Sequence, residues 1–155
     1  TAVVPKPLRQ LTFLSALVLA ATLVSGTLVT GAGPHAGDKS PERPVPRLEI
    51  EIVTLVHTHA NLLIGYLCLL VGLGAGLVAV AAPRRVRHRL VVLLAVVAGQ
   101  GLIGLVQYRT GVPAGLVALH VAGAAICTIA TAALWASMRQ RTPVRQRTEA
   151  EALAR

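Results

Sequence analysis

Charged and aromatic residues are scarce in this sequence: they make up 14% and 3% of its 155 residues, whereas 54% are hydrophobic. The mean hydropathy is +0.68, and a soluble domain of this size cannot bury so much apolar surface, so the composition predicts an integral membrane protein. A net charge of +9 would suit nucleic acid. However, the basic residues lie at the ends of apolar runs without interleaved aromatic residues, so we expect no nucleic-acid partner.

Cysteine is equally scarce. Cys68 and Cys127 both lie inside apolar runs, and their spacing fits neither a disulfide framework nor a zinc site. We expect both to be small buried residues. The first apolar run is long and no clear cleavage signal ends it, so we expect no signal peptide. The missing initial Met suggests a piece of a longer protein.

Four long stretches contain no Asp, Glu, Lys or Arg. They are residues 10–37, 52–83, 90–108 and 110–138, each near the length that spans a bilayer. Pro34, Pro83 and Pro113 fall in the connections, where a missing N–H does no harm. We therefore predict an all-α integral membrane four-helix bundle within residues 1–138, with helices at about 11–30, 54–82, 90–107 and 114–138.

The charges outside these stretches divide unequally between the two sides of the membrane. One side carries eleven basic residues: Lys6, Arg9, Arg84, Arg85, Arg87, Arg89, Arg139, Arg141, Arg145, Arg147 and Arg155. The other side carries four basic and four acidic residues: Lys39, Arg43, Arg47, Arg109, Asp38, Glu42, Glu49 and Glu51. The positive-inside rule then predicts a plasma-membrane protein with both termini in the cytoplasm. Residues 139–155 are expected to form a disordered, basic cytoplasmic tail, and residues 31–53 a long external loop.

His59 and His120 are ionisable residues inside predicted spans, where such groups are costly and usually functional. His59 follows Glu51 by about 12 Å of helix, and His120 follows Pro113 by about 10 Å. Both helices run inward, so the two imidazoles are expected at similar depth, near the external face. Histidines on facing bundle helices can bind one heme iron from both sides. The alternative is that each histidine bonds only a neighbouring carbonyl.

The other histidines are weaker candidates. His57 lies about 200° around the helix from His59, so both cannot bind the same iron, and the pattern alone does not choose between them. The role of His35, in the external loop, stays open. His88 lies among cytoplasmic arginines and is expected to be a solvated loop residue.

Polar residues and glycines cluster near the third span. Gln100 and Gln107 are seven residues apart and share a helix face. Arg109 follows at the external boundary, where it could bind an anionic heme propionate or serve as an interfacial anchor. Residues 99–104 match the GxGxxG pattern, but they lie within a span, so we reject a dinucleotide site. These glycines, with Gly72 and Gly76, indicate close approach of helices or of a flat ring.

Four stretches resemble the C-terminal half of heme A synthase. They are GTLVTGAGPHAGD at 26–38, HANLL at 59–63, QGLIGLVQYRTGVP at 100–113 and LHVAG at 119–123, and they occur in the family's order. That family has eight membrane helices in two similar halves, and it oxidises a methyl group of heme O to the formyl group of heme A for cytochrome oxidase. The resemblance implies that His59 and His120 are the axial ligands of a heme b cofactor, and it favours His59 over His57.

The resemblance also implies partners. They are the N-terminal half of the same protein, which takes the heme O substrate, together with membrane lipids; heme O synthase and a second copy of the chain are further candidates. A substrate half has a Glu one turn before its first histidine, whereas Val56 stands three residues before His59, and the loop cysteine pair of many first halves is missing. Both departures fit the cofactor half, so we expect no catalytic residue here.

Two other functions remain open on the sequence. The first is a stand-alone b-type cytochrome that carries electrons without enzymatic activity. The second is a heme-free half-transporter in which the histidines relay protons or bind a solute.

Overall fold

The computed structural model describes residues 1–34 and 48–139. This part of the chain forms four α-helices: α1 (Lys6–Ala32), α2 (Ile52–Ala79), α3 (Arg84–Arg109) and α4 (Ala114–Ser137). Each helix is long and apolar enough to cross a membrane, since about 20 apolar residues suffice. The prediction of an all-α bundle with four apolar spans is therefore confirmed.

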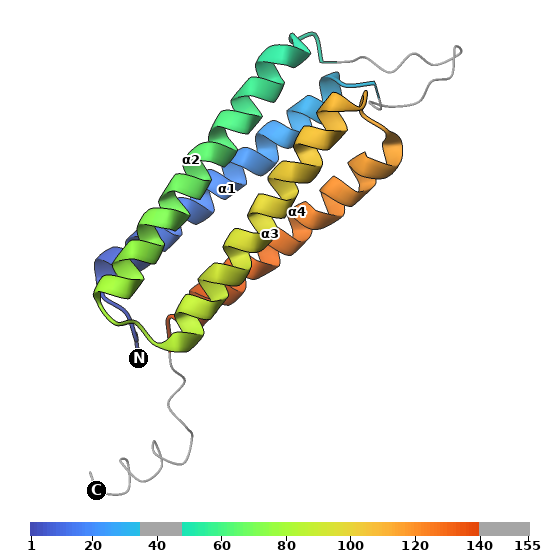
Figure 1. Cartoon of the computed structure of the whole chain (residues 1–155). Coiled ribbons are helices and arrows are strands. Elements are labelled where there is room, and N and C mark those ends of the chain that lie inside the picture. Colours follow the sequence, from blue (N-terminus) through green and yellow to red (C-terminus); the bar gives the residue numbers. More distant parts are fainter. Residues whose placement is uncertain (35–47, 140–155) are drawn as a thin grey trace, which may run out of the picture.

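The four helices form two pairs (Figure 1). α1 packs along α2 and α3 along α4, while fewer contacts join α2 to α3 and α1 to α4. The N-terminal segment and the connection between α2 and α3 lie at one end of the bundle. We call this the basic end, and the end with the α3–α4 turn the loop end. The basic end carries Lys6, Arg9, Arg84, Arg85, Arg87, Arg89 and Arg139.

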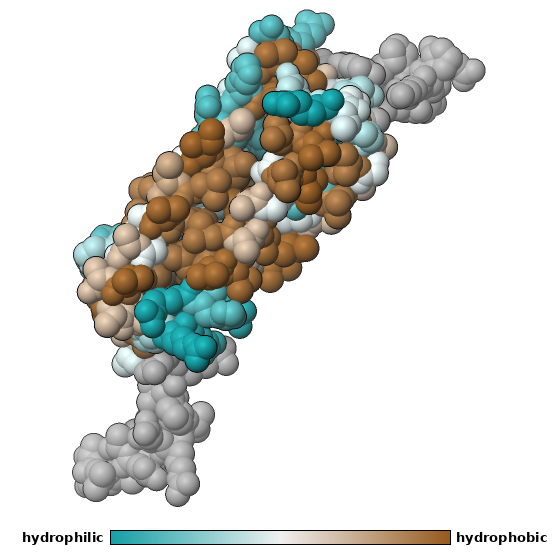
Figure 2. All heavy atoms as spheres, viewed as in Figure 1, coloured by the Kyte–Doolittle hydropathy of each residue, from teal (hydrophilic) through white to brown (hydrophobic). Residues whose placement is uncertain are grey.

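The outer faces of the helices are apolar. Figure 2 shows hydrophobic side chains over the middle of the visible face and hydrophilic ones gathered toward its two ends. Large side chains such as Val71, Leu102 and Ile129 are more than 60% exposed. Because lipid tails rather than water surround a membrane-spanning bundle, such exposure is expected here and needs no covering protein.

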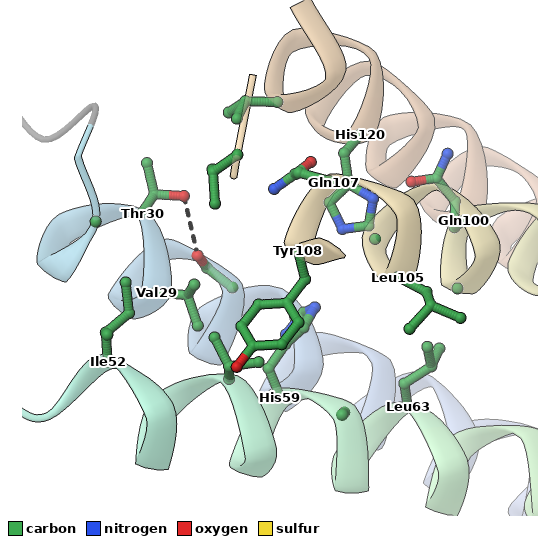
Figure 3. A pocket seen from close by; sticks show the side chains of 18 of the residues that line it. Val29, Thr30, Ile52, His59, Leu63, Gln100, Leu105, Gln107, Tyr108 and His120 are labelled. Carbon is green, nitrogen blue, oxygen red and sulfur yellow. Dashed lines mark hydrogen bonds between the residues drawn. The ribbon is translucent and has the colours of Figure 1, made fainter. Parts of the chain in front are cut away.

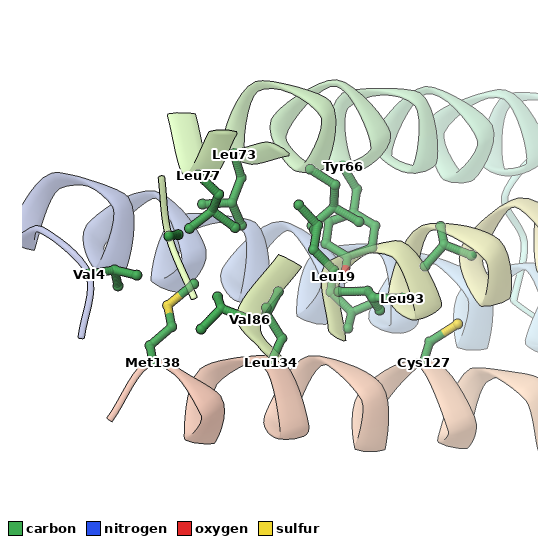
Figure 4. Close-up of a cluster of buried hydrophobic side chains, with 14 residues drawn as sticks. Val4, Leu19, Tyr66, Leu73, Leu77, Val86, Leu93, Cys127, Leu134 and Met138 are labelled. Atoms are coloured by element: carbon green, nitrogen blue, oxygen red, sulfur yellow. The ribbon is translucent and has the colours of Figure 1, made fainter. Parts of the chain in front are cut away.

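The hydrophobic core fills the half of the bundle nearer the basic end (Figure 4). Leu73 and Leu77 of α2, Val86 and Leu93 of α3 and Leu134 of α4 are fully buried there. The N-terminal segment closes this end, because the amide of Val3 donates to the carbonyl oxygen of Met138 at 2.9 Å. Toward the loop end this packing gives way to a cavity.

Several helix ends differ from the sequence prediction. α1 begins at Lys6 rather than near residue 11, and Pro7 lies in its first turn, where the missing amide hydrogen costs no helical bond. α3 begins at Arg84 rather than near residue 90. The prediction placed the start of the helix after the last arginine, at the beginning of the uncharged stretch. Arginine is a good helix former, so the helix begins earlier. α2 ends at Ala79, because Ala81 adopts a left-handed conformation with φ of 48°.

One burial prediction was wrong. Cys127 is buried as expected, but Cys68 is exposed on the outer surface of α2, because a thiol is apolar enough to face lipid. Other predictions concern residues outside the described part of the chain: the tail from residue 140 onward, His35, and the charges of the long loop at Asp38, Lys39, Glu42, Arg43 and Arg47.

Candidate heme site between the two helix pairs

A cavity of about 400 Å³ opens between the two helix pairs in the half of the bundle nearer the loop end (Figure 3). This volume is within the range of cofactor and small-molecule sites. All four helices contribute to its lining, through residues such as Gly26 of α1, His59 of α2, Gln100 and Gln107 of α3 and His120 of α4. The cavity extends to Pro34 and Val112, which lie at the loop end itself.

His59 and His120 face the same space from opposite helix pairs (Figure 3). Their ring centroids are 6.3 Å apart and their planes cross at 72°. Two imidazoles that bind one metal ion from opposite sides have centroids about 6–6.5 Å apart, since each metal–nitrogen bond is about 2 Å and each ring adds about 1.2 Å. The structure thus brings together the pair expected from helix depth, at a spacing that suits one shared ion.

The ring of His59 is held by α1. Its Nδ1 lies 2.9 Å from the carbonyl oxygen of Thr22 and 3.0 Å from the hydroxyl oxygen of Ser25. A carbonyl oxygen only accepts hydrogen bonds, so in the neutral ring Nδ1 carries the hydrogen and donates it. The lone pair is then on Nε2, which is the nitrogen left free to bind a metal, and the bonds to α1 fix the orientation of the ring.

The ring of His120 has no comparable support. Its Nδ1 is buried without a hydrogen-bond partner among the described residues, and so are the side-chain oxygens of Gln100 and Gln107. All three residues line the same cavity. Buried polar atoms without partners are uncommon in folded proteins. Their concentration around one cavity means that a polar ligand or ordered water bound there would find unpaired polar partners.

A glycine lies beside each imidazole. A Cβ atom added to Gly26 would come 3.1 Å from Cε1 of His59, and one added to Gly104 would come 3.1 Å from Cε1 of His120. A Cβ on Gly123 would clash with the side-chain amide of Gln100. These glycines let bulky polar side chains lie directly against a neighbouring helix. The close approach predicted from the sequence is confirmed at Gly76, Gly101 and Gly104, each of which has a side chain of a neighbouring helix against it. Gly72 and Gly99 have no such neighbour within 4 Å.

The remaining predicted residues lie at the margin of the site or away from it. His57 borders the cavity but is exposed, and Tyr108, which was not predicted as a site residue, also lines it. Arg109 ends α3, is exposed and does not line the cavity. His88 is exposed at the basic end and belongs to α3 rather than to a loop.

Ser25 and the carbonyl of Thr22 contribute to the site but were not predicted from the sequence. A signal for them exists, because Thr12, Ser15, Thr22 and Ser25 recur on one face of α1 and all four are buried. Such a buried polar face on a membrane helix indicates contact with other polar groups. It does not reveal which group the hydroxyls reach.

The ligand set of this site is small. Within residues 1–34 and 48–139, no three His, Cys, Asp or Glu side chains gather as a metal cluster, and no carboxylate lines the cavity. Zinc sites use at least three protein ligands. Two histidines on facing helices could also hold a metal ion whose other ligands come from a macrocycle. The chain matches no protein-family profile, no curated protein sequence and no solved structure.

Proposed function

We propose that the chain is the heme b-binding, C-terminal half of heme A synthase, an oxidoreductase that converts a methyl group of heme O to the formyl group of heme A. The observation that carries this proposal is the pair His59 and His120, whose ring centroids lie 6.3 Å apart across a cavity between two helix pairs. Both histidines lie within the four stretches that resemble that family, and this resemblance is the reason for proposing this enzyme.

The residues around the cavity fit a heme by their chemistry. His59 and His120 would hold the heme iron, and the heme would supply a one-electron redox centre. Gly26 and Gly104 let the two rings lie against the neighbouring helices. Gln100 and Gln107 offer polar atoms that lack partners in the protein. Arg109, at the end of α3, is proposed to bind a propionate at the wet end of the site.

The chemistry of heme O oxidation is assigned to the other half of the protein. A proton-transferring residue must lie within hydrogen-bond reach of the reacting group, and no carboxylate of residues 1–34 or 48–139 lines this cavity. The described carboxylates, Glu49 and Glu51, precede α2, and Glu51 accepts a hydrogen bond from the Thr54 hydroxyl at 2.8 Å. This half would therefore bind its heme for electron transfer or for stability, beside an N-terminal half that holds the substrate.

A stand-alone b-type cytochrome is the second candidate, because the same two histidines would serve a pure electron carrier. The native gene distinguishes the two functions: a second four-helix half encoded upstream excludes the stand-alone cytochrome. A heme-free half-transporter is distinguished by the absence of any heme spectrum from membranes with an adequate heme supply.

The test is spectroscopic. The longest native form of the protein is purified, and its reduced-minus-oxidised spectrum and pyridine hemochrome are recorded. We expect a low-spin b-type signal that is lost or becomes high-spin in both His59→Ala and His120→Ala. His57→Ala is the matched control, since this exposed histidine lies on the same helix and should leave the signal unchanged.

The contrary outcomes are equally distinct. A folded but colourless protein would overturn the heme assignment and favour the transporter. A b-type spectrum that is unchanged in both His59→Ala and His120→Ala would show that the heme binds at another site. Loss of the signal in His57→Ala, with His59→Ala unaffected, would show that His57 rather than His59 is the ligand on α2.

A further inference from the structure

A second cavity lies at the basic end of the bundle, away from the histidines. It is open toward the surface and is lined by Lys6, Arg9, Gln10 and Phe13 from the first turns of α1 and by Trp135 from the last turn of α4. α1 and α4 share the fewest contacts of the four neighbouring helix pairs. The cavity therefore occupies the seam where the bundle is least tightly packed.

The charge of this cavity is positive and is not offset by the described protein. Lys6 and Arg9 are three residues apart, so they project from the same face of α1. Arg9 is half-buried. The described carboxylates, Glu49 and Glu51, precede α2 at the opposite end of the bundle. Two adjacent cations, one of them partly removed from solvent, favour an anionic ligand.

The wall of the cavity is aromatic. The rings of Phe13 and Trp135 pack at a centroid distance of 6.4 Å with planes tilted by 52°. Phe13 is 56% exposed, and Leu17, one turn further into the span on the same face, is 52% exposed. Tryptophan is typical of membrane helices at the level of lipid headgroups. The cationic cavity thus continues directly into an apolar strip that faces lipid.

We propose that this cavity binds one anionic phospholipid, with its phosphate headgroup between Lys6 and Arg9 and an acyl chain along Phe13 and Leu17. Basic pockets between membrane helices suit such headgroups. The apolar strip favours a lipid over free phosphate, because an acyl chain gains from contact with apolar side chains and a soluble anion does not. The site is independent of the histidine cavity and does not require the function proposed above.

The chain has a single tryptophan, so Trp135 reports on this cavity alone. The full chain is placed in phosphatidylcholine nanodiscs, and phosphatidylglycerol or phosphatidylcholine with brominated acyl chains, which quench tryptophan on contact, is titrated in. We expect phosphatidylglycerol to quench Trp135 at a much lower mole fraction. Lys6→Gln combined with Arg9→Gln should remove this preference, at about fivefold in relative affinity for each cation.

The matched control is Arg84→Gln combined with Arg85→Gln, which removes the same charge from the same end but outside the cavity. Salt screens exposed charges over about 8 Å under physiological conditions, and neither arginine lines the cavity. This variant should therefore keep the preference for phosphatidylglycerol. Equal quenching by the two lipids in the wild-type protein would overturn the proposal without any variant. An equal loss in the control pair would overturn it in favour of diffuse surface charge. Protection of Trp135 by millimolar inorganic phosphate would identify a free-anion site instead.

Discussion

At the residue scale, the two histidines are placed by their neighbours in a repeated way. Each ring lies against a glycine of the helix that pairs with its own, Gly26 for His59 and Gly104 for His120. The next contact differs between the pairs. One turn before Gly26, the carbonyl of Thr22 accepts a hydrogen bond from His59. One turn before Gly104 stands Gln100, whose side-chain oxygen is unpaired. His59 is therefore the more firmly positioned of the two rings.

In the proposed heme site, Gly104→Val should weaken heme binding, because the new side chain would push the imidazole of His120 toward the cavity. Overpacking of this kind costs about 1–3 kcal/mol, which corresponds to roughly 5- to 150-fold in affinity. Hemin titration of the purified apoprotein, followed by low-spin absorbance, measures the change. Gly99→Val is the control on the same helix, since nothing lies within 4 Å of its added Cβ. Equal losses in both variants would assign the effect to helix packing in general.

The sequence could predict the features of this site that depend on distance along one helix. It could not predict those that depend on the register between neighbouring helices. The shared depth of His59 and His120 follows from counting residues from the helix ends, because the rise per residue is fixed. Their contacts with Ser25, Gly26 and Gly104 depend on how neighbouring helices slide and rotate against each other. That register is set by the fit of many side chains, so no local pattern specifies it.

At the scale of the helices, one hydrogen bond crosses the centre of the bundle. The hydroxyl of Tyr66 on α2 lies 3.0 Å from the hydroxyl of Thr131 on α4, and both residues are buried. Tyr66 is seven residues beyond His59, about 10 Å further along α2, where the cavity gives way to the core. The bond thus links the two helix pairs below the histidine cavity.

Tyr66→Phe should lower the free energy of unfolding by about 0.5–1 kcal/mol, close to the average for hydrogen bonds between membrane helices. The loss is limited because Thr131 keeps its bond to the carbonyl of Cys127 at 2.9 Å. Reversible unfolding in mixed detergent micelles measures it. Tyr108→Phe removes the same hydroxyl from the chain's only other tyrosine, which is exposed, and should change stability by less than half as much. A larger loss in Tyr108→Phe would contradict the role given to the central bond.

The helices themselves were largely predictable, and the errors have one cause. The length of the stretches without charged residues identified all four spans, because the thickness of the bilayer sets the length of a spanning helix. The same criterion missed the first turn of α1 and six residues of α3, where Lys6, Arg9 and the arginines from Arg84 onward are helical. Helix propensity continues beyond the apolar region, so charge marks where a span leaves the membrane rather than where its helix begins.

At the scale of the whole molecule, the asymmetry of charge predicts how the bundle is oriented in the membrane. Seven of the eight Lys and Arg residues of the described chain lie at the basic end, and only Arg109 lies at the loop end. Both described carboxylates also precede α2 at the loop end. Positively charged segments near membrane helices are retained in the cytoplasm. We therefore expect the histidine cavity near the extracytoplasmic face and the phospholipid cavity in the cytoplasmic leaflet.

This orientation can be tested with single cysteines in a Cys68→Ala, Cys127→Ala background. Thr110→Cys lies at the loop end and His88→Cys near the basic end, and both positions are exposed. In intact cells, a membrane-impermeant maleimide should label Thr110→Cys only, whereas His88→Cys should react after permeabilisation. The native Cys68, restored alone, is the control: it is exposed within a span, so it faces lipid and should stay unlabelled under both conditions. The reverse labelling pattern would place the basic end outside, against the positive-inside rule, and the histidine cavity near the cytoplasm.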